Sequence, residues 1–475
     1  MATLSHYPLL PSMRLTMSLL IFIGSSLNVA VVLAMNFAWV CMVNTTSANA
    51  SRPSTQNGHN AILLEWNKTQ QQYIFAGYYI GGTIILFISG PLIHKIGSKH
   101  IFGVGIGVAA VANMLIPAAA KHLNFIAVIF LRIVIGFGGS FTFPVTMDTS
   151  SHWGANDEMG LLTALSMCGV QVGAATSLMM DGIECNRLGW PWVFYIPSAV
   201  SLLFLLFWYT FYSNKPEQCR WVSQEETAYI VQHRSRGSSQ SKSKRMIPYR
   251  SFLTSPGVWA LCVAASCFGF CFSLAPYVPT YINEVFQLSL EHNGLFSALS
   301  YVAMLMGRLL SGALSDKLLC FKGHTAVVKL FSTLAFLGSA AAFLGLALLD
   351  VHHSIVTIAA CLFLLNFSLI LNTGGYFRST LYLAPDFSGP LASVNNTMTY
   401  IILSTFPFIV SALTFNGTAE EWSQLFYISI GVALLGAVVF LLFGKGEPEA
   451  WYASTTTEQD NSSSIENGKE SATVS

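Results

Sequence analysis

The chain has 475 residues, of which 53% are hydrophobic and only 9% are charged. An ordinary soluble domain carries roughly 25% charged residues, so this composition excludes a water-soluble globular protein. A membrane-spanning helix needs about 20 apolar residues, and the length accommodates a dozen of them with short loops. The formal net charge of +1 gives no reason to expect a nucleic acid partner.

Twelve apolar runs of spanning length fall into six before and six after a long polar stretch. They cover residues 15–43, 72–92, 101–120, 124–148, 160–181, 191–213, 256–282, 293–315, 328–350, 354–375, 391–414 and 425–444. The first run is too long for a cleaved signal peptide and lacks a small-residue cleavage site at the right distance. The sequence therefore predicts an all-α membrane protein with two six-helix halves, residues 15–213 and 256–445.

Lysine and arginine are unevenly distributed between the two predicted sides of the membrane. With a cytosolic N-terminus, the outer side holds only Arg52, Lys68, Lys121 and Arg187. The positive-inside rule favours this topology, with both termini in the cytosol. It also places four glycosylation acceptors on the non-cytosolic face, three of them in the loop 44–71. They are Asn44, Asn49, Asn67 and Asn416.

Three polar segments complete the domain organisation. Residues 1–14 form a short cytosolic tail, and residues 214–255 form a linker between the halves that is rich in Ser, Lys and Arg. An amphipathic stretch at Ser223–His233 is expected to lie against the inner leaflet. Residues 446–475 are rich in Ser, Thr and Glu with almost no large apolar residue, so we expect a disordered tail.

The nine cysteines show no pairing or metal-binding spacing. Most fall in apolar runs, Cys41 among them, or in predicted cytosolic loops. Cys185 alone is assigned to an outer loop, so a disulfide framework is not expected. No metal or other cofactor site is predicted.

A short motif recurs once in each half, after the second predicted helix. The first copy is Gly90-Pro-Leu-Ile-His-Lys95-Ile-Gly97, and the second is Gly312-Ala-Leu-Ser-Asp316-Lys. The glycine permits close helix contact, and the basic residue holds the loop in the cytosol. Two copies at equivalent positions argue for parallel repeats of the kind found in major facilitator transporters.

Several stretches resemble the anion:cation symporter family of the major facilitator superfamily. They are Trp39–Asn44, Arg132–Pro144, Pro279–Tyr281, Asn293–Leu299, Ala384-Pro385 and Glu420–Trp422. That family includes sialic acid, vesicular glutamate, vesicular nucleotide and sodium-phosphate transporters. The resemblance implies a major facilitator fold and transport of organic or inorganic anions by alternating access. It also implies coupling to protons, sodium or membrane potential.

The chain departs from the family at several charged positions. The frequent helix-one arginine falls on Val32, and the helix-four glutamate falls on Gly139, seven residues after Arg132. A histidine found in helix two of some members falls on Phe75, and an arginine of helix seven falls near Cys267. Several charged positions that the family associates with glutamate recognition and proton coupling are therefore absent from this chain.

Arg132 is the main candidate for binding the substrate. It lies about eight residues into the fourth predicted helix from the outer side, near the level where substrates bind in this class. A guanidinium there can hold a carboxylate or phosphate in a two-pronged pair. The alternative is an arginine that snorkels outward or caps a neighbouring helix.

Two further charged residues are assigned to gating or structure. Asp148 lies sixteen residues beyond Arg132, about 24 Å along a helix axis, so the two cannot touch. An interfacial carboxylate that pairs with a loop lysine is the favoured interpretation, and an inner gate or proton relay is the alternative. Arg308 precedes Gly312 and Asp316 by one and two turns, which favours a cytosolic clamp in the second half.

Uncharged polar residues in the spans complete the candidate cavity. Asn36, Tyr79, Gln171 and Tyr281 are predicted to contact substrate, and Asn28, Tyr78 and Asn372 are further candidates. Any one of them is more often a helix–helix hydrogen bond than a ligand contact. The glycine run 136–139 is better explained by helix packing than by nucleotide binding, because no strand precedes it. No enzyme motif is found.

The leading hypothesis is a secondary transporter of a small anion that needs no obligate protein partner. The alternatives are an uncoupled uniporter, because the helix-four carboxylate is missing, and a transport-dead sensor or scaffold. H⁺ or Na⁺ is the open choice of coupling ion. Tyr7-Pro-Leu-Leu fits a short endosomal sorting signal, which leaves plasma membrane and lysosomal or vesicular membrane open.

Overall fold

The computed structural model describes residues 12–42, 64–154, 158–233, 254–319, 323–348, 355–383 and 388–449. Within these residues, twelve helical segments are long and apolar enough to cross a membrane. All the elements found there are helical. The predicted fold class and the six-plus-six division are confirmed. Asn44, Asn49 and most of the tail 446–475 lie outside the described residues.

The first half contains six spans, of which the fourth is broken. The elements are α1 (Met13–Met42), α2 (Lys68–Ile96), α3 (Ser98–His122), α4 (Phe125–Gly139) with α5 (Thr142–Trp153), α6 (Met159–Arg187) and α7 (Trp192–Phe211). A short helix, α8 (Gln224–His233), follows where the amphipathic stretch was expected.

The second half repeats this plan with more irregular spans. Span seven joins α11 (Pro256–Phe272) to α12 (Val278–Tyr281) through a 3-10 turn and ends in a π-helical turn at Ile282–Phe286. Span ten joins α15 (Ile355–Ile370) to α16 (Tyr376–Leu383). The others are α13 (Leu290–Leu319), α14 (His324–Leu348), α17 (Ser388–Leu413) and α18 (Ala419–Phe443).

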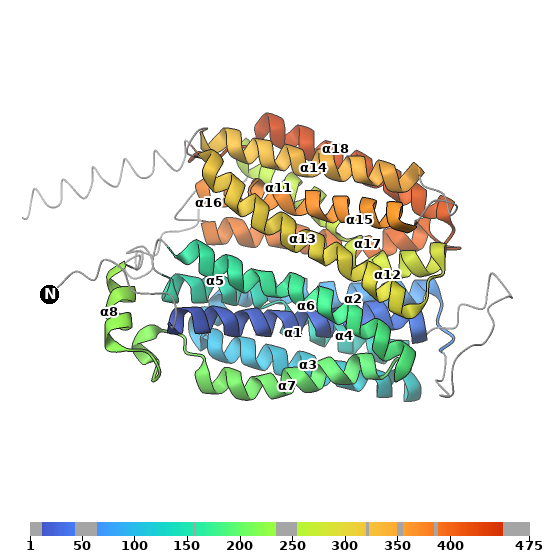
Figure 1. Ribbon diagram of the computed structural model, residues 1–475, viewed down its shortest axis with the longest axis horizontal. Helices are drawn as coiled ribbons and strands as arrows, with labels where there is room; N and C mark the ends of the chain where they lie inside the picture. Colours follow the sequence, from blue (N-terminus) through green and yellow to red (C-terminus); the bar gives the residue numbers. More distant parts are fainter. Residues whose placement is uncertain are drawn as a thin grey trace, which may run out of the picture.

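The two halves lie one above the other in Figure 1 and meet mainly through α6 against α13 and α2 against α17. We call the end of the bundle with Met13 and α8 the linker end, and the end with Met42 and Lys68 the loop end. Hydrogen bonds between the halves gather at the loop end. Lys68 Nζ donates to Glu284 Oε2 at 2.9 Å, and Tyr277 Oη donates to Gln72 Oε1 at 2.6 Å.

The linker helix α8 is fastened to the start of α1. Arg14 is fully buried and pairs with Glu226 of α8 and with Glu158, which precedes α6. The backbone nitrogens of Met13 and Arg14 also donate to the Glu226 carboxylate. A buried arginine needs such partners, and the result is that α8 is held by the first half.

The turn between α2 and α3 depends on Gly97, one of the predicted motif glycines. Its φ of 88° and ψ of 149° fall in a region essentially restricted to glycine. A Cβ there would lie 2.5 Å from Asn214 Nδ2, while Asn214 Oδ1 accepts from Lys99 N at 2.7 Å. The turn brings Ser98, at the start of α3, into a hydrogen bond with Asp148.

We expect Gly97→Ala to lower the free energy of unfolding by about 1–3 kcal/mol, because alanine pays the backbone strain and meets Asn214. Thermal unfolding in detergent measures the change. Gly431→Ala in α18 is the control, since a Cβ there meets no atom within 4 Å. An equal effect of both substitutions would contradict the structural role of Gly97.

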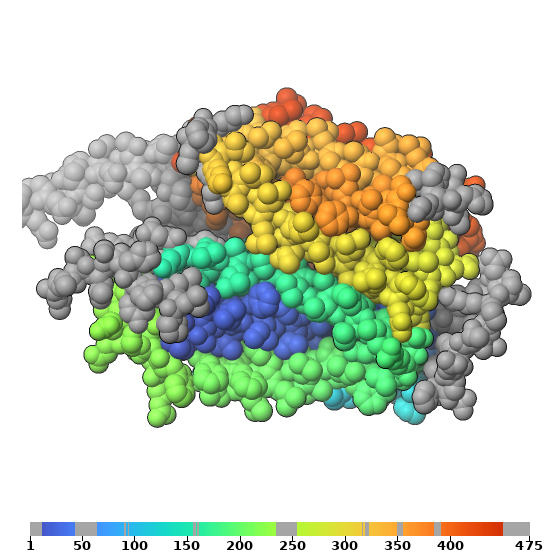
Figure 2. All heavy atoms as spheres, viewed as in Figure 1, coloured from blue at the N-terminus to red at the C-terminus, as the bar shows by residue number. Residues whose placement is uncertain are grey.

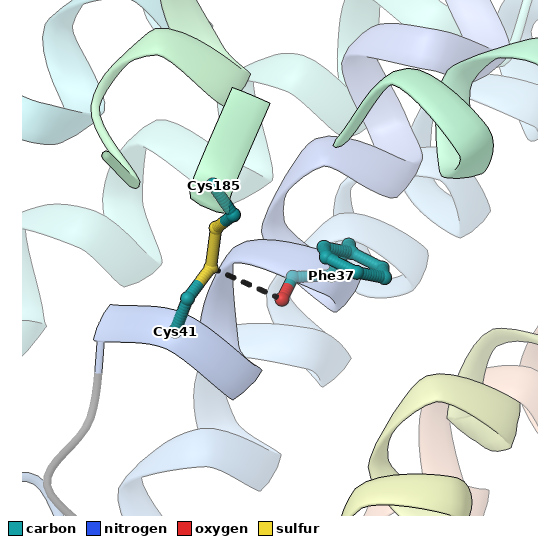
Figure 3. The surroundings of a disulfide bond; sticks show 3 residues. All are labelled: Phe37, Cys41 and Cys185. Carbon is teal, nitrogen blue, oxygen red and sulfur yellow. Dashed lines mark hydrogen bonds between the residues drawn. A yellow bond between two sulfur atoms is a disulfide. The ribbon is translucent and has the colours of Figure 1, made fainter. Parts of the chain in front are cut away.

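A disulfide joins Cys41 of α1 to Cys185 of α6, so the expectation of no disulfide is wrong (Figure 3). The predicted span 160–181 ended too early: α6 continues to Arg187 and carries Cys185 into the helix. Cys41 lies one residue from the end of α1, and the two Cα atoms are 6.5 Å apart. The bond therefore ties two helices of the same half at the loop end.

We expect Cys41→Ser and Cys185→Ser each to lower stability by about 2–5 kcal/mol, with the double variant no worse than either single one. Thermal unfolding with and without reducing agent measures this, and reductant should lower the Tm of wild type alone. Transport should persist, because both helices move with one half. A reductant-sensitive double variant would contradict the assignment.

Candidate functional site

A cavity of about 240 Å³ lies at mid-height in the bundle. It is lined from α1, α2, the break between α4 and α5, α6 and, from the second half, α17. The lining residues are Ser25, Asn28, Val29, Val32, Tyr78, Gly139, Ser140, Thr142, Phe143, Met167, Val170 and Tyr400. A larger groove of about 500 Å³ between α1 and α7 is almost wholly apolar, as at Leu203 and Phe207. It suits a lipid chain better than an ionised solute.

Arg132 lies directly behind the wall of this cavity. Its side chain is 1% exposed, and Nη1 donates to the carbonyl oxygen of Val32 at 3.0 Å. The guanidinium carbon lies 5.3 Å from the centre of the Tyr78 ring. Its Nε is buried without a hydrogen-bond partner, and no ion pair among the described residues includes Arg132. The structure thus presents a buried cation without a carboxylate.

Two tyrosines of α2 lie beside the arginine, and tyrosines of the second half lie beside Tyr79. Tyr78 and Tyr79 of α2 both interact electrostatically with Arg132. The Tyr79 ring centre lies 6.2 Å from that of Tyr400 on α17, and Tyr301 of α13 also lies within electrostatic range of Tyr79. Phenol hydroxyls donate and accept hydrogen bonds without adding charge. The site therefore combines one strong cation with neutral donors.

The break in span four is fixed by Asn28 of α1. Its Nδ2 donates to the carbonyl oxygen of Gly139 at 2.9 Å and to Thr142 Oγ1 at 3.0 Å. This satisfies a carbonyl left free where α4 ends. Gly139 is the position on which the resemblance to the family places a helix-four carboxylate, and a Cβ there would lie 3.0 Å from Asn28 Oδ1. Asn28 occupies the space that a larger residue would need.

The residues predicted to bind substrate separate into three places. Arg132 and Tyr79 come together beside the cavity. Gln171 lies behind the lining residue Met167: with its amide oriented to satisfy both ends, Nε2 donates to Met167 O at 2.9 Å and Oε1 accepts from Arg308 Nη2 at 3.1 Å. Asn36 and Tyr281 lie elsewhere.

Asn36 and Tyr281 belong to the loop-end contacts. Asn36 Nδ2 donates to the carbonyl oxygen of Pro276 at 3.3 Å, which links α1 to span seven. The Tyr281 ring packs against Phe286, Trp422 and Phe426. Both were predicted from polarity inside a span, and polarity does not distinguish a substrate contact from a helix contact.

Asp148, at the linker end, does not have the partner that was expected from the sequence. Its carboxylate accepts a hydrogen bond from Ser98 and lies 3.5 Å from His152 Nδ1, so the prediction that it pairs with a loop lysine is wrong. The partial positive charge at the start of α3 provides the compensation. The close contact expected at Gly312 is not present, since a Cβ there meets nothing within 4 Å. Lys95 is exposed, and Gly90 lies within α2.

Two buried carboxylates were not predicted from the sequence. Asp181 and Glu184 are 2% and 8% exposed near the loop end of α6, and Ser177 donates to Asp181 Oδ2 at 3.1 Å. Neither lines the cavity. Asp181 was the last residue of a predicted span, so its burial followed only from the longer helix. Asn67 and Asn416 are exposed and cap or flank helices, and their glycosylation stays a prediction.

Two six-span halves around a central cavity, with a buried arginine beside it, form the architecture of a secondary solute transporter. The Major Facilitator Superfamily model matches residues 12–407, and the chain belongs to that superfamily.

Within that superfamily, the chain is similar to transporters of the anion:cation symporter family, which confirms the resemblance seen in the sequence. It is 28% identical to sialin of Homo sapiens over 94% of this chain and 92% of that protein. It is 29% identical to vesicular glutamate transporter 3 of Danio rerio over 84% of this chain and 68% of that protein. It is 25% identical to sodium-dependent phosphate transport protein 3 of Mus musculus over 94% of this chain and 96% of that protein.

A solved structure shares the fold. It is a bacterial homologue of the human lysosomal transporter Spinster in an inward-facing and unoccupied conformation. The TM-score is 0.67 at 14% sequence identity, over 91% of this chain and 97% of the other.

Proposed function

We propose that the protein is a secondary transporter of small organic anions or phosphate that works by alternating access. Arg132 holds the anion, and the two halves rock around the cavity. Transport is driven by an ion gradient or by membrane potential. The relatives include transporters named for glutamate and for phosphate, which supports an anionic solute.

The observation that carries the proposal is the unpaired charge of Arg132. A charge at the bilayer centre costs at least about 2.5–3.5 kcal/mol, so such residues normally face a partner or a water-filled path. Arg132 has a carbonyl and an aromatic ring beside it, but no carboxylate among the described residues. An anion that enters the adjoining cavity supplies the missing charge.

Alternating access is supported by the distribution of contacts between the halves. Polar contacts at the loop end join Lys68 to Glu284, Gln72 to Tyr277 and Asn186 to Glu291. The molecule is therefore closed at the loop end, and these contacts must break for the opposite state to form.

The proposed orientation places both termini and α8 in the cytosol, in a plasma, lysosomal or vesicular membrane. The lysine and arginine distribution favours this. The Cys41–Cys185 disulfide at the loop end adds support, because disulfides persist in oxidising compartments.

A second candidate keeps transport but removes ion coupling. Gly139 stands where the family's helix-four carboxylate falls, and Asn28 fills the adjoining space. A uniporter driven by membrane potential or by the solute gradient fits this. Uptake insensitive to both pH and sodium would favour it, and steep proton dependence would exclude it.

The test is radiolabelled uptake into proteoliposomes of phosphate, glutamate, sialic acid, urate and a nucleotide, under imposed proton, sodium and voltage gradients. Wild type should take up at least one anion, and Arg132→Ala should not. A folded wild-type protein that transports none of them would favour the transport-dead alternative. The dependence on each gradient names the driving force.

A further inference from the structure

Arg308 of α13 is a second cation of the membrane interior without a carboxylate partner. Its side chain is partly buried, and its Nε is buried with no hydrogen-bond partner. Nη2 reaches Gln171 Oε1 on α6 at 3.1 Å, and Cys168 of α6 lies within electrostatic range. No ion pair among the described residues includes it.

The cytosolic clamp predicted for Arg308 does not supply a charge partner. Asp316 lies eight residues further along α13, about 12 Å at 1.5 Å per residue, and about 80° around the helix. Arg308 instead faces the other half of the molecule, since α6 and α13 belong to different halves.

Arg308 stands one contact behind the cavity wall, as Arg132 does. Gln171 accepts from Arg308 and donates to the carbonyl oxygen of Met167, which lines the cavity. Arg132 donates to the carbonyl oxygen of Val32, another lining residue. The cavity is thus flanked by one arginine from each half.

We propose that Arg308 is a second anion-binding residue, and that the cavity is selective for divalent anions held between Arg132 and Arg308. This rests on the proposed function. Two cations without carboxylates favour a ligand of charge −2 over one of −1, because each guanidinium is compensated only when both are contacted. Because the arginines belong to different halves, the bound dianion also draws the halves together.

The test measures binding to purified full-length protein by ligand-dependent shifts in Tm, which report Kd without requiring transport. Succinate and butyrate, two four-carbon acids with two carboxylates and one, are the probes, and inorganic phosphate is the third. Wild type should bind succinate and phosphate more tightly than butyrate. Arg308→Gln should weaken succinate and phosphate binding by about ten- to a hundredfold and leave butyrate binding nearly unchanged.

Three further variants make the result specific. Arg308→Lys keeps the charge and should retain part of the preference for dianions. Lys329→Gln removes a partly exposed cation of α14 whose Nζ donates to the carbonyl oxygen of Leu442, away from the cavity, and should leave the binding of all three probes unchanged. Gln171→Leu leaves both arginines in place and substitutes for Arg308→Gln if that variant does not fold. It should weaken dianion binding, because the hydrogen bond from Arg308 to Gln171 that holds the guanidinium in position is lost.

The outcomes separate this inference from the proposed function. One outcome is that wild type binds or takes up an anion and that folded Arg308→Gln keeps the same preference for succinate. That result overturns the binding role of Arg308 and leaves the proposed transport function intact. Equal loss of succinate and butyrate binding also overturns it, because that result is a structural effect. No anion binding and no uptake by wild type overturns both.

Discussion

Arg132→Gln is expected to reduce anion uptake to background while the protein remains folded. Glutamine keeps hydrogen-bonding capacity but removes the charge that holds the anion, so binding and transport are lost together. Arg132→Lys should retain only a small fraction of activity, because an ammonium cannot contact the Val32 carbonyl and an anion in the same planar fork. Uptake in proteoliposomes normalised to reconstituted protein measures both.

The matched control for Arg132 is Arg220→Gln, the same exchange at an exposed position. Stability also separates a binding role from a structural one. Removing a buried charge that has no carboxylate relieves a desolvation cost, so the Tm of Arg132→Gln should be equal to or above that of wild type. Full uptake by Arg132→Gln, or a collapse of its Tm, would contradict the assignment.

Gly182→Leu is expected to abolish transport by preventing closure at the loop end. Gly182 of α6 lies against α13, where a Cβ would fall 2.7 Å from the carbonyl oxygen of Leu290. The reciprocal Cβ at Gly294 would fall 2.5 Å from the carbonyl oxygen of Leu178. A leucine cannot fit between the two backbones, so the halves must separate there. The cycle then stops with the loop end open.

A reporter cysteine distinguishes a trapped transporter from a misfolded one. Asn36→Cys places a thiol behind the loop-end contacts, at a side chain 4% exposed. An impermeant thiol reagent added on that side should label it in the Gly182→Leu background and much less in wild type. Gly431→Leu is the control, since its neighbourhood is open. Unchanged labelling with normal uptake would show that the close contact is not needed.

Gly136→Leu offers the opposite comparison. Its Cβ would lie 2.1 Å from the carbonyl oxygen of Tyr78, and α4 and α2 belong to the same half. Because the two helices move together, the steric clash cannot be relieved by separating the halves. It is expected to lower the yield of folded protein rather than to trap one state of the transport cycle.

The fold could be predicted because a membrane span has a strong compositional signature. Helix ends were less accurate, since polar caps extend helices beyond their apolar runs. Asn67 and Gln70 form a capping box that starts α2 at Lys68, four residues before the predicted run. Thr418 and Glu421 do the same for α18, six residues early.

The sequence identified the site residue whose position in an apolar run is costly because of its charge. It did not identify features that depend on contacts between helices. Arg132 stood out because a cation in an apolar run is costly, and the structure places Tyr79 beside it. Asn36 and Tyr281 could not be separated from cavity residues, since helix contacts use the same side chains. The disulfide depended on the relative height of α1 and α6, and the break at Gly139 depended on Asn28.

The Asn28 bridge makes two distant positions depend on each other. A designer who wished to give this transporter a titratable carboxylate in the cavity would start at Gly139, and Gly139→Glu alone would push against the Asn28 amide. A smaller residue at position 28 would make room for the glutamate, but it would remove the hydrogen bonds from Asn28 to the Gly139 carbonyl and the Thr142 hydroxyl. The route from this neutral cavity to an acidic one therefore passes through a less stable protein whichever substitution is made first.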